Sequence, residues 1–139
     1  MKSYTDIKQS KKLAEFLPLE SADMFYSDIF IDEKHKYNSH YLETYGFKTF
    51  EDTKQKESKH LSFLPCWSLS ALYDILPNNK KETTTLSRGG WKIEPIEYLD
   101  NWWCEYEDES HTKDFTVSAN NSVDACVAMI EKLNELKLL

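Results

Sequence analysis

The sequence predicts an α+β fold, in which an antiparallel β-meander over about residues 83–118 is packed by a C-terminal helix. Three observations support this prediction. Apolar and polar residues alternate through the meander, as they do in strands with one buried face. An apolar stripe at helical spacing follows residue 121. Two shorter helical patterns, near 5–17 and 68–76, supply the rest of the expected core.

The meander is expected to open with a two-residue hairpin at Gly89-Gly90. Paired glycines supply the positive φ that such turns need. The resulting register pairs Arg88 with Trp91 and Leu86 with Ile93. It also leaves one face of the hairpin apolar and the other polar, so the turn chemistry and the alternation agree.

Two further strands complete the predicted meander, after a tight turn at Asp100-Asn101. The third strand presents alternate residues to its two faces: Trp102, Cys104 and Tyr106 to one, and Trp103, Glu105 and Glu107 to the other. An acidic turn at 108–110 leads to the last strand, whose inner face is expected to carry Phe115 and Val117.

The C-terminal helix is the strongest local signal. Asn121 is a favourable N-cap, and Asp124 sits three residues on, where a carboxylate meets the positive end of the helix dipole. An apolar stripe follows at helical spacing, made of Val123, Cys126, Val127, Ile130 and Leu133 and widened by Met129 and Leu136. This stripe is expected to cover the apolar face of the meander.

The N-terminal half is less regular. Thr5 can cap the first helix, and Pro18 is expected to end it because a proline disfavours helical geometry at the residue before it. Residues 24–31 and, more briefly, 45–50 favour strands, while 32–40 and 51–60 are polar runs typical of loops. We expect 51–60 to be the most mobile segment of a single domain that spans 1–139.

Composition points to a reducing cytoplasm. The chain has 139 residues, 40% of them hydrophobic, enough for a core without disulfides or a metal. Its three cysteines, Cys66, Cys104 and Cys126, are odd in number and far apart, which indicates reduced, packed thiols. No signal-peptide pattern occurs at the N-terminus, and no apolar run approaches the ~20 residues of a membrane span. We therefore expect a cytoplasmic protein that does not enter a membrane.

The net charge of −7 is concentrated in one segment. Residues 97–114 hold seven acidic side chains against the single lysine Lys113, which leaves −6 there. A chain without a basic stripe cannot neutralise phosphates, so direct binding to DNA or RNA is disfavoured. Only three glycines occur, and neither a dinucleotide-binding motif nor a P-loop can be written, so no cofactor is expected.

Several phrases resemble a group of small uncharacterised proteins carried on prophages and mobile elements of gut bacteria. The shared phrases run over 12–15 with 17–24, over 65–72 with Leu76-Pro77, and over 121–130. In that group a proline often follows the capping asparagine, where this chain has Ser122; both residues suit the first helical turn. The resemblance implies a bacterial, cytosolic setting. It carries no functional residue over, because no activity is established for the group.

Metal binding and nucleophilic catalysis have only weak support in the sequence. His35 and His40 are five residues apart and lack a nearby cysteine pair, so we predict no metal site. Cys66 precedes a helix, where a dipole could activate a thiol, but its neighbours indicate a packed core residue. The acidic cluster at 105–109, with His111 after it, invites a cation or carboxylate-dyad site; strand alternation and turn preference explain it more simply.

A protein-interaction surface is the function that the pattern favours. Alternation sends Trp103 outward beside acidic side chains, and exposed aromatics beside charge are typical of partner sites. The alternative is that the N-terminal segment or the helix at 68–76 covers this face, so that the ring belongs to the core. The candidate surface consists of Trp103, Glu105, Glu107, Asp108 and Glu109. We therefore expect a small non-enzymatic accessory protein that binds an unknown protein partner, with a homodimer as one arrangement; a phosphate mimic that binds a nucleic-acid-binding protein would be its sharpest form. The alternative is a small enzyme that uses Cys66 or the cluster at 105–109.

Overall fold

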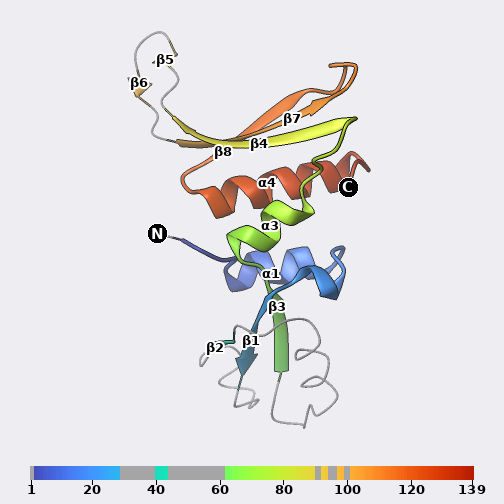
Figure 1. Cartoon of the computed structure of the whole chain (residues 1–139). Helices are drawn as coiled ribbons and strands as arrows, with labels where there is room; N and C mark the ends of the chain where they lie inside the picture. The colour runs from blue at the N-terminus through green and yellow to red at the C-terminus, as the bar shows by residue number, and fades with distance from the viewer. Residues whose placement is uncertain (1, 29–39, 44–61, 90–91, 94–96, 99–100) are drawn as a thin grey trace. The chain divides into compact units, whose positions relative to one another are not determined.

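The computed structural model describes residues 2–28, 40–43, 62–89, 92–93, 97–98 and 101–139. The strand expected at 45–50 and the mobile segment expected at 51–60 lie outside these ranges. The chain divides into two compact units, one of Tyr4–Ala71 and one of Met1–Ser3 with Leu72–Leu139 (Figure 1). Each unit combines helix with antiparallel sheet, which confirms the α+β class.

Helix α1 (Ile7–Ala14) opens the first unit. Asp6 caps it, and not Thr5 as predicted: the Asp6 carboxylate accepts from the Gln9 amide at 2.8 Å, and the Gln9 side chain accepts from the Asp6 amide at 3.1 Å. This reciprocal capping box satisfies two amides that the first turn leaves without partners. Thr5 instead is fully buried. The predicted end at Pro18 is a few residues late, because α1 already ends at Ala14; the short 3-10 helix η1 (Leu19–Ser21) follows Pro18.

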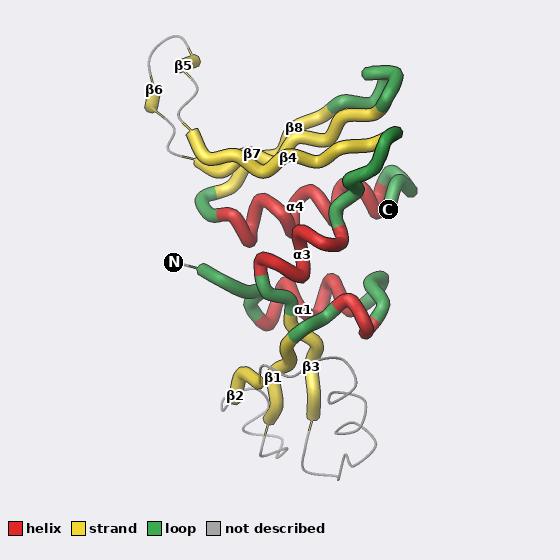
Figure 2. The backbone as a smooth tube through the Cα atoms, in the orientation of Figure 1, coloured by secondary structure: helices red, strands yellow, loops and turns green. Residues whose placement is uncertain are grey.

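A three-stranded sheet completes this unit (Figure 2). Strand β1 (Met24–Asp28) lies between β2 (His40–Glu43) and β3 (Ser62–Cys66), antiparallel to both. The predicted strand at 24–31 is thus confirmed over its described part, whereas no strand was expected at 62–66. Helix α1 packs against β3. Beside it Trp67 is fully buried, and its indole nitrogen donates to the Ser21 hydroxyl at 2.9 Å.

Helix α3 (Leu69–Ile75) matches the helix predicted at 68–76. The Ser68 hydroxyl accepts from the Ala71 amide at 3.2 Å, which caps the first turn. The helix stops before Pro77, which cannot donate a backbone hydrogen bond.

The second unit is built on the sheet β4-β7-β8, whose strands are β4 (Glu82–Gly89), β7 (Asn101–Asp108) and β8 (Phe115–Ala119). The predicted Gly89-Gly90 hairpin is wrong. Strand β4 continues through Gly89, which lacks a positive φ, and its partner is β7. Leu86 lies opposite Cys104, not opposite Ile93.

Residues 92–93, which were expected in the second hairpin strand at 91–95, pair with a later segment and not with β4. Strand β5 (Lys92–Ile93) pairs with β6 (Glu97–Tyr98) in a separate two-stranded element. The predicted four-stranded meander is therefore a three-stranded sheet with an excursion between its first two strands. Trp91 and the turn at Asp100 lie outside the described residues.

Helix α4 (Ser122–Glu135) covers one face of this sheet (Figure 1). As predicted, Asn121 caps it, and its side chain accepts from the Asp124 amide at 2.8 Å. The whole predicted stripe is buried except Leu136, which is 46% exposed because it lies just past the helix end. Cys104 and Tyr106 meet this helix from β7 and are buried too, so the predicted alternation of the third strand is confirmed.

Candidate functional site

The side of the sheet β4-β7-β8 away from α4, called here the outer face, carries three of the five predicted surface residues. Its side chains are Thr83, Thr85 and Ser87 from β4, Trp103, Glu105 and Glu107 from β7, and Thr116 and Ser118 from β8. All are exposed except Trp103, which is half-buried. The outer face thus has two carboxylates and one large ring, and no basic residue of these three strands shares it.

The Trp103 ring is held in a fixed place on this face. Its indole nitrogen donates to the Gly89 carbonyl at 3.1 Å. Its cross-strand neighbours are Ser87 on β4 and Ser118 on β8, whose small side chains leave the ring accessible. An aromatic ring held in this way offers contact area at little further cost in conformational entropy.

Asp108 belongs to the β7–β8 turn and not to the outer face. One carboxylate oxygen accepts from the Thr112 amide at 2.9 Å, and the other accepts from the Ser110 hydroxyl at 2.9 Å and the Thr112 hydroxyl at 3.2 Å. Desolvation alone would raise the pKa of Asp108, but these hydrogen bonds outweigh it and hold the pKa below its ordinary value. Asp108 is therefore a turn-forming residue.

The same turn holds a histidine, an aspartate and a serine, the residue types of a hydrolase triad. His111 Nδ1 lies 2.9 Å from Asp114 Oδ2, and this hydrogen bond, with the negative charge of Asp114, raises the pKa of His111. The Ser110 hydroxyl, however, contacts Asp108 and Thr112 and not His111. A catalytic triad needs a hydrogen bond between the nucleophile and the base, so the turn does not have the geometry of an acyl-transfer site.

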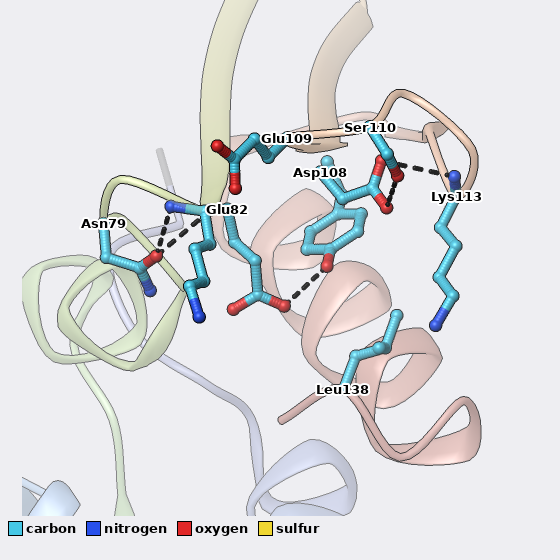
Figure 3. Close-up of a pocket in the computed structure, with 9 residues that line it drawn as sticks. Asn79, Glu82, Asp108, Glu109, Ser110, Lys113 and Leu138 are labelled. Atoms are coloured by element: carbon cyan, nitrogen blue, oxygen red, sulfur yellow. Dashed lines mark hydrogen bonds between the residues drawn. The ribbon is translucent and has the colours of Figure 1, made fainter.

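Glu109 lines a pocket of about 550 Å³ at the end of the sheet where β4 begins and β7 ends (Figure 3). The other lining residues are Asn79, Lys81, Glu82, Tyr106, Asp108, Ser110, Lys113 and Leu138. The Tyr106 hydroxyl donates to Glu82 Oε1 at 2.6 Å. Burial, followed by this hydrogen bond, raises the pKa of Tyr106 to about 12. With charges of both signs and a protonated tyrosine, the pocket contains no activated nucleophile.

No three histidine, cysteine, aspartate or glutamate side chains converge on a possible metal position within the described ranges. His35 and His60 lie outside those ranges. Both carboxylate oxygens of Asp108 accept hydrogen bonds from its own turn, at positions that a bound cation would need.

Cys66, the predicted alternative nucleophile, is fully buried at the end of β3. Its thiol donates to the Thr5 carbonyl at 3.5 Å and accepts from the Thr5 hydroxyl at 3.6 Å. Burial raises the pKa of Cys66, although hydrogen bonds from Thr5, Tyr26 and Ser10 act in the opposite direction. A nucleophilic cysteine needs a stabilised thiolate and an approach for substrate, so Cys66 is better explained as a core residue. Cys104 and Cys126 are likewise buried, free thiols.

Sequence reasoning missed the polar cluster around Thr5. The Thr5 hydroxyl lies 2.8 Å from the Ser10 hydroxyl and accepts from the Trp67 amide at 3.1 Å, while the Tyr26 hydroxyl donates to the Thr5 carbonyl at 2.7 Å. The capping-box spacing of Asp6 and Gln9 could have revealed that Thr5 is free for this role. The cluster is internally satisfied and joins the N-terminal segment to β3, so its role is structural.

Known proteins give no further information on this site. No family model, curated protein or solved structure matches the chain. Among the described residues, no helix has the length and apolar character needed to cross a bilayer.

Proposed function

We propose that the chain is a small, non-enzymatic interaction protein whose outer face binds a basic surface of another protein. One observation carries the proposal: Trp103 stands half-exposed beside Glu105 and Glu107 on a sheet face that has no helix over it among the described residues and no basic side chain from its three strands. Tryptophan is enriched among the residues that dominate binding energy, and carboxylates on strands that present no basic side chain to the same face favour a cationic partner.

The charge distribution supports a basic partner. Most of the net charge of −7 arises between residues 97 and 114, the segment that contains β7 and its turn. Concentrated negative charge accelerates encounter with a positive surface. In its sharpest form the partner is a nucleic-acid-binding protein, whose phosphate-binding surface would accept carboxylates in place of phosphates. The resemblance to prophage proteins gives the proposal a bacterial, cytoplasmic setting.

The test uses matched baits made from the full chain: the wild type, Trp103→Ala, the double variant Glu105→Gln/Glu107→Gln, and Glu135→Gln as a charge control. Glu135 is exposed at the end of α4, on the other side of the sheet. A protein captured from a bacterial lysate is purified and titrated against each bait at two salt concentrations.

We expect Trp103→Ala to weaken binding by at least ~2 kcal/mol, the usual threshold for a dominant interface residue. The double glutamine variant should lower the association rate and reduce its dependence on salt, while Glu135→Gln behaves as the wild type. A captured partner that binds all four baits equally, or that is itself acidic, would contradict the proposal.

A further inference from the structure

Strand β8 forms one edge of the sheet among the described strands, and its own residues carry none of the usual protection against further pairing. It pairs with β7 in an unbroken register from Trp102 opposite Ala119 to Tyr106 opposite Phe115. On its other side, none of the described residues forms a strand with it. Its sequence, Phe-Thr-Val-Ser-Ala over 115–119, contains no charge, proline or glycine. Proteins usually protect edge strands with lysines, prolines or bulges, so β8 can accept another strand.

Apolar side chains of β8 remain partly in water. Phe115 and Val117 are half-buried, although they lie on the face that α4 covers. Their direct partners on β7, Tyr106 and Cys104, are 1% and 0% exposed. The difference arises from the edge position, because no strand in the described part of the chain lies on the other side of β8. A strand added there would bury this apolar surface, with a gain of about 25 cal/mol per Å² removed from water.

We propose that the occupant is β8 of a second copy, paired antiparallel about Val117. In this arrangement Thr116 lies opposite Ser118 of the second copy, and Phe115 lies opposite Ala119. Every pair across the two-fold axis is then uncharged, which matters for a chain with a net charge of −7.

The Glu105 side chains of the two copies stay far apart in this dimer. Glu105 stands on β7, one strand in from the edge, so the two Glu105 residues are separated by three strand spacings, about 14 Å. That distance exceeds the Debye length of about 8 Å at physiological salt, so their repulsion is largely screened. The other edge strand, β4, carries charged residues near both of its ends, Glu82 and Arg88, and is the better protected of the two.

Two five-residue strands make a small interface, so we expect a dimer in the micromolar range. The full chain is sedimented at concentrations from about 1 to 300 µM, a range that suits weak interfaces. Its mass should rise from that of one chain to twice that value. The key variant is Thr116→Lys/Ser118→Lys, which places lysines opposite lysines in the dimer. In the single chain these exposed positions lie opposite Glu105 and Trp103, so the fold is expected to tolerate them.

The matched control is Thr83→Lys/Thr85→Lys, which adds the same charge to the same face at the other edge. We expect the β8 variant to raise the dimer dissociation constant at least tenfold with an unchanged circular dichroism spectrum, and the control to remain dimeric. A wild-type chain that stays monomeric up to about 300 µM would overturn the proposal, since even weak interfaces form there. Loss of the dimer in the control alone would overturn it too.

A cross-linking experiment tests the register. Thr116→Cys and Ser118→Cys chains are mixed and oxidised with diamide, which takes up the two electrons and two protons released as the disulfide forms. The native thiols are buried in all copies. Pairing about Val117 predicts more cross-linked dimer in the mixture than in either variant alone. Equal yields in all three samples would overturn this register.

Discussion

Two hydrogen-bonded clusters in this protein use similar chemistry in opposite environments. In the first unit, Thr5 and Ser10 share a hydrogen bond at 2.8 Å and both are fully buried. In the second unit, Asp108 gathers the amides and hydroxyls of its own turn, where most side chains are exposed. Hydrogen bonds lost in a dry interior leave orphaned groups, whereas those lost at the surface are replaced by water. Burial, and not the number of bonds, should therefore decide what each cluster contributes to stability.

The largest effect on the free energy of unfolding should come from truncating a buried apolar side chain. This change breaks no hydrogen bond, so it gives a reference value for the two clusters. Ile130 is fully buried in α4 against the sheet. Ile130→Ala should lower the free energy of unfolding by about 2–4 kcal/mol, through lost transfer free energy and a residual cavity. Urea denaturation followed by circular dichroism measures it. A loss below about 1 kcal/mol would mean that the stripe of α4 does not face a packed core.

Thr5→Val should have the next largest effect on the free energy of unfolding. Valine keeps the shape of threonine but removes the hydroxyl, which leaves the Trp67 amide without its acceptor and the Ser10 hydroxyl without its partner. Leaving buried groups unsatisfied costs about 1–3 kcal/mol. Thr5→Ser, which keeps the hydroxyl, is the control and should lose much less in the same urea experiment. Equal losses in both variants would show that packing, and not hydrogen bonding, explains the burial of Thr5.

Asp108→Ala should destabilise the chain less than Thr5→Val. The turn amides that donate hydrogen bonds to Asp108 lie at the surface and can donate to water instead. The expected result is a smaller fall in the urea midpoint, together with faster hydrogen exchange confined to residues 109–114. If Asp108→Ala cost as much as Thr5→Val, burial would not be the deciding factor and the comparison would fail.

The smallest effect is a pH dependence at the same turn. Asp114 raises the pKa of His111, so the protonated imidazole is favoured in the folded state. Its stabilising contribution is present below the ordinary histidine pKa and is lost as the pH rises through the raised folded value. Proton NMR of the full chain should show the His111 pKa above that of a free histidine, with His111→Gln to assign the resonance. Asp114→Asn should return the pKa toward normal; an unchanged value would mean that Asp114 is not its cause.

The sequence by itself determined the parts of this protein that depend on near neighbours. Asn121 and the stripe that includes Ile130 predicted α4, because capping and helical periodicity act within a few residues. Alternation placed Trp103 and Glu105 on one face of β7, since side chains on a strand must point to opposite sides in turn. Both residues belong to the predicted surface of Trp103, Glu105, Glu107, Asp108 and Glu109.

Only the tertiary structure decided what depends on distant partners. The Gly89-Gly90 pair satisfied the local rule for a hairpin, yet β4 pairs with β7 over eight residues, a longer ladder than the short hairpin offered. Asp108 is an exception: the sequence pattern grouped it with the surface glutamates, although the turn donors that hold it, Ser110 and Thr112, lie only two and four residues away. Thr5 and Asp6 are both good caps, and the local capping box favours Asp6. Only the tertiary structure shows what Thr5 does instead, because its hydroxyl contacts Cys66 and Trp67, which lie 61 and 62 residues away.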